Sequence, residues 1–414
     1  MRSQSFLPPS RGVALLLLPL ACSAPPEPSS ADDAGALRLV REDPTDSPLA
    51  GLTDEQLAVF AEGDVLFEDP LRESQGLGPL FIRRSCGSCH ADDAKGPGAV
   101  NKMVFTLEDG FTPAPDQSAL PFGFTVRPYA TAGASTPITA PEGVKLTTRV
   151  GPAVFGRGYL EAIREDEILR MEQLQQGRAD GVSGRVSRVT YHSVTARDRG
   201  YGSHTLGETN LVGRFGLKAR VVSLDDFTAD AYQGDMGITS PLRPNELPNP
   251  DGLGDDERPG LDVTLETVEK VSDYVRMLAI PRRAEPEAGA PELFEQAGCA
   301  VCHVPSLRTR ADHPLAPLRD VDAPVYTDLL LHDMGAELAD AQTDENAEPR
   351  EWRTAPLVGL RHLRSLMHDG RASTVADAIR HHRGEGSEAN ASVDLYDALS
   401  VEQQQKLIRF VESL

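Results

Sequence analysis

The chain has 414 residues, of which 40% are hydrophobic and only 5% aromatic, with 41 basic and 63 acidic side chains. This length gives room for two or three domains, and the formal net charge of -22 argues against nucleic acid as a partner. An acidic surface instead keeps a protein soluble or attracts a basic partner protein.

The N-terminus predicts export from the cytoplasm. Arg2 and Arg11 give the N-terminus a positive charge ahead of a short apolar run, Val13 to Leu20, which is followed by Ser- and Pro-rich sequence. A run of this length is too short to span a membrane and is typical of a signal peptide. We therefore predict a signal peptide over residues 1–21 and a flexible linker over residues 22–50.

The end of this signal resembles that of a bacterial lipoprotein. In such a signal Cys22 would carry the lipid and attach the protein to the outer membrane. Pro19 stands where an aliphatic residue is usual, so ordinary cleavage near Ala24 is the alternative. Both readings place the mature chain in the periplasm.

The first element after the linker is a helix that begins at Thr53. Thr53 is a suitable N-cap, because its side chain can accept a hydrogen bond from the first turn. Apolar residues then recur at roughly helical spacing, at Leu57, Phe60, Leu66 and Phe67.

Four of the five cysteines lie in two copies of one motif, C-x-x-C-H. The first copy holds Cys86, Cys89 and His90, and the second holds Cys299, Cys302 and His303. Zinc would need no histidine at a fixed place and would have to unite two pairs far apart in the chain. A dithiol redox site also leaves the histidines unexplained. Covalent haem explains every position, because two sulfurs form thioethers and the histidine binds the iron.

A long segment separates the first motif from the helix that closes its unit. Residues 96–203 are rich in Gly, Pro, Thr and β-branched side chains. VKLTTRV at 144–150 and GRVSRVTYHSV at 184–194 alternate polar and apolar residues, which predicts short strands or a hairpin. The segment is either an insertion that covers or gives access to the first haem, or a surface elaboration.

Each motif stands between two predicted helices. A helix with an apolar stripe from Val268 to Leu278 closes the first unit before Pro281, and a helix behind the cap Ser400 closes the second. A helix before the motif and one after it are what a small cytochrome c domain requires. We predict a mainly α protein with two cytochrome c-type domains, at residues 51–284 and 285–414. The first is enlarged by the insertion, with some short β-strands.

Seven segments in chain order resemble the signatures of the bacterial di-haem oxidoreductase family. They are GLGPLFIRRSCGSCH, RVGPAVFGRGYLEAI, GRFGLKAR, GDMGITSPL, YTDLLLHDMG, EWRTAPLVGL and MHDGRASTVADAIRHHRGE. Members are labelled peroxidases or "thiol oxidoreductases" and are distantly related to the di-haem cytochrome c peroxidases. The resemblance implies two cytochrome c domains that pass electrons between their haems. The thiol label finds no support, because thioethers would leave no thiolate to react.

The resemblance also implies ligands for the second haem. The family pattern places its sixth ligand at His382, on the helix after His368-Asp369-Gly370, although a solvent-exposed helix histidine is the plain alternative. Two imidazoles on one iron close it to substrate and suit it to electron storage. Arg353 and Arg371, which lie in family motifs, are candidates to neutralise the haem propionates.

At the first haem, Asp235-Met236 resembles the acidic residue and methionine that related peroxidases place in the distal pocket. Peroxide cleavage needs a group that moves a proton between its oxygens, which makes Asp235 the candidate acid/base. Met236 could alternatively be a sixth ligand. Other ligand candidates are Met103, His192 and His204, which the sequence does not rank.

The function expected from this pattern is that of a periplasmic, peroxidase-like enzyme. The second haem would receive electrons from a small donor protein, and the first would reduce hydrogen peroxide. The alternative is an electron-transfer protein without catalysis, in which both irons are six-coordinate. Relatives also imply a calcium ion at the domain interface, but no compact D-x-D-x-D run announces one here.

Overall fold

The computed structural model describes residues 45–90, 99–107, 113–117, 120, 123–135, 142–195, 197–254, 260–342 and 344–414. The predicted signal peptide, Cys22 and most of the predicted linker lie outside these residues. Among the described residues, no helix has both the length and the apolar character that crossing a membrane requires. Residues 45–50, assigned to the linker from the sequence, pack on the folded part: the Leu49 amide donates to the Met277 carbonyl at 2.8 Å, and Leu49 is buried.

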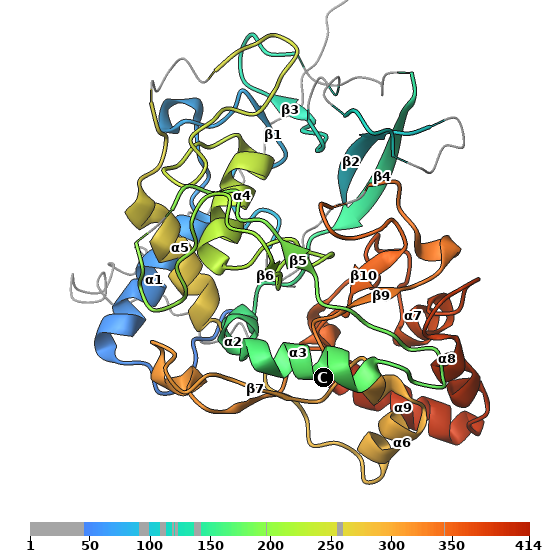
Figure 1. Ribbon diagram of the computed structural model, residues 1–414. Coiled ribbons are helices and arrows are strands. Elements are labelled where there is room, and N and C mark those ends of the chain that lie inside the picture. The colour runs from blue at the N-terminus through green and yellow to red at the C-terminus, as the bar shows by residue number, and fades with distance from the viewer. Residues whose placement is uncertain are drawn as a thin grey trace, which may run out of the picture. The chain divides into compact units, whose positions relative to one another are not determined.

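Two long helices form the expected pair in the first half of the chain. Helix α1 (Asp54–Glu68) starts with a capping box in which Thr53 and Gln56 each bond the other's backbone amide. Helix α5 (Leu265–Met277) begins behind the cap Thr264. The two helices pack together, as Figure 1 shows in blue and yellow-brown, and the ring of Phe60 lies 4.9 Å from that of Tyr274.

The segment between these helices contains more helix than the sequence suggested. It holds α2 (Arg157–Ala162), α3 (Glu165–Gln175) and α4 (Leu224–Met236). Helix α2 is buried over most of its length, α4 buries the polar Asp226 among its apolar residues, and α3 buries only Ile168, Met171 and Gln175, so none of them shows a wide apolar stripe. Helices α2 and α4 both pack on α5.

The strands of this segment form two-stranded antiparallel sheets. The pairs are β1 (Leu80–Phe81) with β3 (Tyr129–Ala130), β2 (Ala99–Phe105) with β4 (Val144–Val150), and β5 (Arg188–Val189) with β6 (Leu211–Val212). The predicted strand at 144–150 is therefore confirmed as β4. In the predicted strand at 184–194, only Arg188 and Val189 form a strand, β5. The segments 144–150 and 184–194 do not form a hairpin with each other, because β4 pairs with β2 and β5 pairs with β6.

The second half repeats the helix pair around its motif. Helix α6 (Ala290–Gln296) packs on α9 (Val401–Ser413), which begins with a capping box at Ser400. Helices α7 (Val375–His381) and α8 (Asn390–Asp397) lie beside them (Figure 1). The strand pairs are β7 (Leu307–Arg308) with β8 (Asp322–Ala323), and β9 (Leu331–Asp333) with β10 (Glu351–Arg353). Short 3-10 turns occur at Glu73–Gln75, Cys299–Val301, Ala316–Leu318, Ala336–Leu338 and Leu360–His362.

The largest hydrophobic core is shared by both halves of the chain. Phe60 and Phe155 belong to the same buried cluster as Leu307, Val325 and Val358. The described residues all belong to one compact unit, and the domain boundary at 284/285 stays a prediction. The fold of the described residues is mixed: helices do most of the packing, and small antiparallel sheets lie between them.

Candidate functional sites

Both C-x-x-C-H motifs fold into the same tight turn. In the first motif, the amides of Cys89 and His90 donate to the Cys86 carbonyl at 3.0 and 2.9 Å. In the second, the amides of Cys302 and His303 donate to the Cys299 carbonyl, the latter at 2.9 Å. Each motif therefore holds its two cysteines and its histidine within one turn of backbone.

The environment of the cysteines suppresses thiolate chemistry. Burial, followed by the charge of Asp235, raises the pKa of Cys86 to about 12 and that of Cys89 to about 11. Burial also raises the pKa of Cys299 to about 12. Because the thiolate is the form that attacks disulfides and binds zinc, these sites do not favour redox exchange or a zinc centre.

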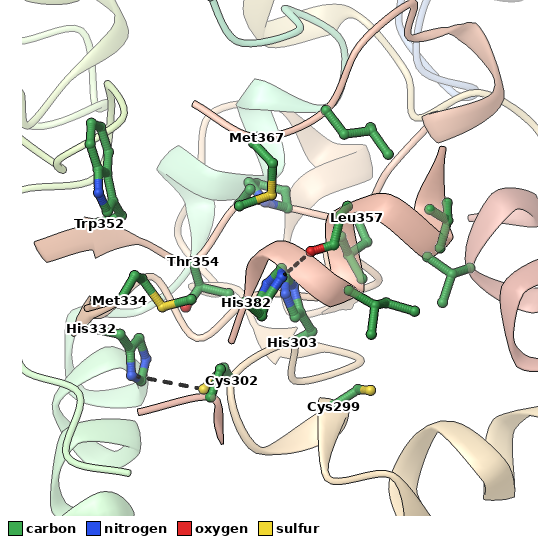
Figure 2. Close-up of a pocket in the computed structure, with 18 of the residues that line it drawn as sticks. Cys299, Cys302, His303, His332, Met334, Trp352, Thr354, Leu357, Met367 and His382 are labelled. Atoms are coloured by element: carbon green, nitrogen blue, oxygen red, sulfur yellow. Dashed lines mark hydrogen bonds between the residues drawn. The ribbon is translucent and has the colours of Figure 1, made fainter. Parts of the chain in front are cut away.

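A cavity of about 280 Å³ lies against the second motif (Figure 2). Its wall includes Cys299, Cys302, His303 and His382, and most of the rest is apolar. The apolar wall is built from both halves of the chain, by Val150, Pro152, Ala153, Val182, Leu357, Leu360, Leu363, Leu366, Val375, Ile379, Leu407 and Val411. Such a lining suits a large apolar cofactor held by a few polar groups.

Two histidines face each other across this cavity. His303 follows the 3-10 turn of the motif, and His382 caps the C-terminus of α7. Their ring centroids are 6.4 Å apart, and the ring planes make an angle of 57°. Nδ1 of His303 lies 3.1 Å from the Tyr326 carbonyl, and Nδ1 of His382 lies 2.7 Å from the Ala378 carbonyl.

These hydrogen bonds fix how each ring can bind a metal. A carbonyl only accepts, so each Nδ1 carries the proton and each Nε2 keeps its lone pair. Burial lowers the pKa of His303 to about 4 and lowers that of His382 too, so both rings are neutral. A neutral imidazole with an open Nε2 is a metal ligand.

The separation of the rings fits one metal ion between them. A ligating nitrogen lies about 2 Å from a metal and about 1 Å from its own ring centre, so two rings on one ion have centroids about 6 Å apart. The observed 6.4 Å agrees. The residues present therefore fit a haem with His303 and His382 on its two faces, beside the cysteine pair.

His332 lies beside the second motif but is already occupied. Its Nε2 is 2.9 Å from Asp328 and its Nδ1 is 2.7 Å from Glu388, with the Cys302 sulfur at 3.8 Å. Burial opposes a charge here, but Cys302 and Asp328 raise the pKa of His332 well above its usual value. An imidazolium has no lone pair, so His332 forms hydrogen bonds rather than ligating.

Trp352 and His368 form a stacked pair in the cavity wall. Their rings lie 3.8 Å apart at 17°, and the Trp352 Nε1 donates to the Leu338 carbonyl at 2.8 Å. The buried Lys218 ammonium lies 4.0 Å from the indole centroid. Trp352 is thus held by hydrogen bonding, stacking and a cation beside its ring.

The arginines of the region have different surroundings. Arg353 is buried in the cavity wall, where its Nε donates to the Gly216 carbonyl at 2.9 Å. Arg371 is exposed and bonds Asp369 at 2.7 Å. The sequence reasoning did not single out Arg157, which is buried in the same wall as Arg353. A charged residue between two glycines in the otherwise apolar stretch VFGRGYL was the available signal.

Asp235 lies beside the first motif, at the C-terminal end of α4. Its carbonyl accepts from the Ile82 amide at 2.6 Å, and its charge acts on both Cys86 and Cys89. Burial raises the pKa of Asp235 to about 6, against the lowering effect of Lys102 and Arg220. The neighbouring Met236 is buried in the main core.

The other ligand candidates of the first site are spread out. His192 is exposed and lies 2.8 Å from Glu345. The ring of His204 lies 5.5 Å from that of Tyr191. Met103 is part of β2, but its side chain lies outside the described structure.

One segment of chain touches both sites. A Cβ on Gly151 would lie 3.5 Å from Cε1 of His90, in the first motif. Its neighbours Val150, Pro152 and Ala153 line the cavity of the second. The Val150 amide also donates to the His368 carbonyl at 2.7 Å. We call residues 150–153 the shared wall.

Comparisons with known proteins complete this description. No curated protein matches the chain. Among solved structures, it is similar to hydrazine synthase from Kuenenia stuttgartiensis, with a TM-score of 0.39 and 14% identity over 97% of this chain and 100% of the other. It is also similar to the di-haem peroxidase BthA from Burkholderia thailandensis, with a TM-score of 0.36 and 13% identity over 89% and 88% of the two chains. A MauG-like protein associated with microbial copper homeostasis gives 0.30 and 13% over 61% and 89%. TM-scores this low do not establish a shared fold.

The match to one family's sequence model assigns the chain to a protein family. Residues 132–414, more than half of the chain, match the family described as di-haem oxidoreductase, putative peroxidase, and the chain belongs to that family.

Proposed function

We propose that this chain is an exported c-type di-haem oxidoreductase that reduces hydrogen peroxide. The second site stores and passes electrons, and the first site is where peroxide reacts. The observation that carries the proposal is the facing pair His303 and His382, because two neutral imidazoles leave no position for a substrate at the second site. If the chain reduces peroxide, the reaction therefore belongs to the first site.

Haem supplies an iron that changes oxidation state, and reduction of one peroxide to two waters takes two electrons and two protons. At the second site, His303 and His382 would hold the group from its two faces. Cys299 and Cys302 would bind its edge as thioethers. The apolar lining would exclude water and keep the electron within the protein.

At the first site, Cys86, Cys89 and His90 would hold the first haem, and Asp235 would accept and donate protons. Cleavage of the O–O bond needs a proton moved from one peroxide oxygen to the other. With a pKa of about 6, the Asp235 carboxylate is mostly ionised at neutral pH and can accept that proton and return it. Lys102 and Arg220 favour its ionised form.

The proposal includes a location. The predicted signal peptide would deliver the chain to the periplasm, and a lipid on Cys22 would hold it at the outer membrane. A small electron-donor protein in the same compartment would reduce the second site. Mass spectrometry of the mature N-terminus tests this part by distinguishing a lipid-bearing Cys22 from cleavage near Ala24.

A second candidate function is an electron relay without catalysis. It is favoured by the closed second site, and it would hold if Met236 or another side chain closed the first site as well. Optical and low-temperature EPR spectra of the oxidised and half-reduced protein, with and without hydrogen peroxide, decide between the two. A high-spin signal that peroxide removes supports the enzyme. Two low-spin haems whose spectra do not change on adding peroxide, in either redox state, support the relay.

A further inference from the structure

Two buried arginines in the wall of the second cavity have no acidic partner among the described residues. Arg157 is 7% exposed and Arg353 is 6% exposed. A buried guanidinium is costly unless it is paired with a negative charge. Their positions therefore call for an explanation.

Other buried arginines of the chain show the usual arrangement. Arg276 is 0% exposed and bonds Glu161 at 2.6 Å and Asp225 at 2.8 Å. Arg149 bonds Asp340 at 2.7 Å and Asp344 at 2.9 Å. The fold thus supplies carboxylates to Arg276 and Arg149, neither of which lines the cavity.

The hydrogen bonds of Arg157 and Arg353 position them without neutralising them. Arg157 opens α2, and its Nε donates to the Ala153 carbonyl of the shared wall. Arg353 ends β10 and donates from Nε to the Gly216 carbonyl at 2.9 Å and from Nη1 to the Thr354 carbonyl at 3.1 Å. A guanidinium has five N–H groups, so each keeps donors for a further acceptor.

The charges around the pair do not supply that acceptor. Burial, followed by the charge of Arg353, lowers the pKa of Arg157 to about 9. Burial lowers the pKa of Arg353 to about 10, and Asp328 alone offsets this in part. Asp328 also bonds His332, and so does Glu388, the carboxylate in the cavity wall. Two cations that line the same mostly apolar cavity, close enough for one to lower the pKa of the other, favour a nearby anion.

We propose that Arg157 and Arg353 bind the carboxylate groups of the haem at the second site. This inference rests on the proposed function, which puts a haem there; Arg353 was already a candidate from the sequence, and the structure adds Arg157 beside it in the same cavity wall. A haem carries its two propionate carboxylates on one edge, so they can enter a buried cavity with the ring. A diffusible carboxylate is the other source of the same chemistry, but the burial of both arginines favours an acid that is part of the cofactor.

The charges also have a redox consequence. A fixed cation near the iron disfavours the oxidised form, which has one more positive charge, and so raises the reduction potential. At a separation of about 10 Å and an effective dielectric constant of about 20, one charge changes the equilibrium by roughly tenfold. For a one-electron couple, tenfold corresponds to about 59 mV.

The test is the midpoint potential of the second haem in Arg157→Met and Arg353→Met. We expect the equilibrium constant for reduction of the second haem to be roughly tenfold lower in each variant than in the wild type. In the wild type, paired carboxylates stay ionised and the potential is flat with pH near neutrality. In the variants a carboxylate titrates, so the potential should rise as the pH falls. Arg214→Met is the matched control, because this arginine also bonds only carbonyls among the described residues, those of Leu160 and Ile163 at 3.0 and 2.7 Å, without lining the cavity.

Haem content is measured first by the pyridine haemochrome spectrum, which keeps the two proposals apart. If the exported wild-type protein contains no haem, the proposed function is wrong. Normal haem content with potentials and pH profiles equal to those of Arg214→Met overturns only the arginine assignment. If Arg157→Met loads no haem, Arg157→Gln replaces it, because glutamine keeps N–H donors but removes the charge, and the potential of this variant must still become pH-dependent. A wild-type potential that shifts with added acetate would assign the arginines to a diffusible acid and overturn the proposal.

Discussion

At the scale of single residues, burial favours the neutral form of a side chain at both sites, with a different chemical result at each. At the second site burial lowers the pKa of His303 and of His382, which favours the neutral form that can bind a metal. At the first it raises the pKa of Asp235 to about 6, which makes a carboxyl group an acid/base near neutral pH. The same physical effect thus favours metal binding in one place and proton transfer in the other.

Asp235→Asn tests the proton-transfer role. We expect peroxide reduction to fall by about 100- to 10,000-fold, the usual contribution of a general acid/base. Wild-type kcat/KM should fall as the pH drops through about 6, because protonation removes the base. Steady-state kinetics across this range provide the measurement. Glu246→Gln is the control, since burial raises the pKa of that carboxyl to about 7 at a position away from the motif.

The same variant has an expected effect on stability. The pKa of Asp235 is raised on folding, so the folded state is favoured by protonation and loses that advantage as the pH rises through about 6. Asp235→Asn should therefore raise the melting temperature above this pH while it lowers activity. A melting temperature that fell at every pH would instead indicate a structural role for the carboxylate.

His382→Ala tests the ligand assignment. Removing one imidazole should convert one haem from low-spin to high-spin and open it to small ligands such as cyanide. EPR and optical titration provide the readout. His381→Ala, one residue earlier on the same helix, should leave both haems unchanged, because His381 does not line the cavity. The assignment is wrong if the two variants have the same spectra.

At the scale of elements, close backbone contact sets the position of α2. A Cβ on Gly158 would lie 2.0 Å from the Arg276 carbonyl oxygen of α5. Gly158→Ala should therefore destabilise the protein by about 2 kcal/mol or more, because backbone must move. Gly234→Ala is the matched helical control, since its Cβ would meet nothing within 4 Å, and it should be neutral or stabilising. Chemical denaturation measures both.

The sequence was most informative where local chemistry decides the structure. Thr53 and Ser400 cap helices as expected, because a capping box needs only four consecutive residues. The long strand β4 was predicted, but its partner β2 was not, because pairing depends on distant contacts. The helices α2 to α4 and the buried Arg157 were missed for the same reason: tertiary packing, not an apolar stripe, makes them stable.

At the scale of the whole molecule, ion pairs that are partly or wholly buried join helices to neighbouring segments of the chain. Arg220 pairs with Asp230 of α4, and Arg276 of α5 pairs with Asp225. Although burial opposes ionisation, these arginines lower the pKa of Asp230 and of Asp225 to about 2. The folded state therefore binds protons less tightly than the unfolded state at these groups.

Acid should unfold the protein through these pairs. The stability that they provide is complete above a pH of about 4, the ordinary range of the carboxyl group, and is lost as the pH falls towards about 2. Asp230→Asn should cost on the order of 2 kcal/mol near neutral pH, and the difference from the wild type should shrink in acid. Thermal melts at several pH values measure this. A difference that is constant with pH would show that lost packing, not lost charge, is responsible.

The shared wall has a consequence for how such a protein can be divided. The motif is present twice, which suggests a modular chain, yet residues 150–153 belong to both sites at once. A cut at the predicted boundary of 284/285 would separate the second motif from part of its own cavity, including Arg157. The repeated motif is thus a unit of sequence but not of architecture, and neither half could be exchanged with a relative's without rebuilding the other.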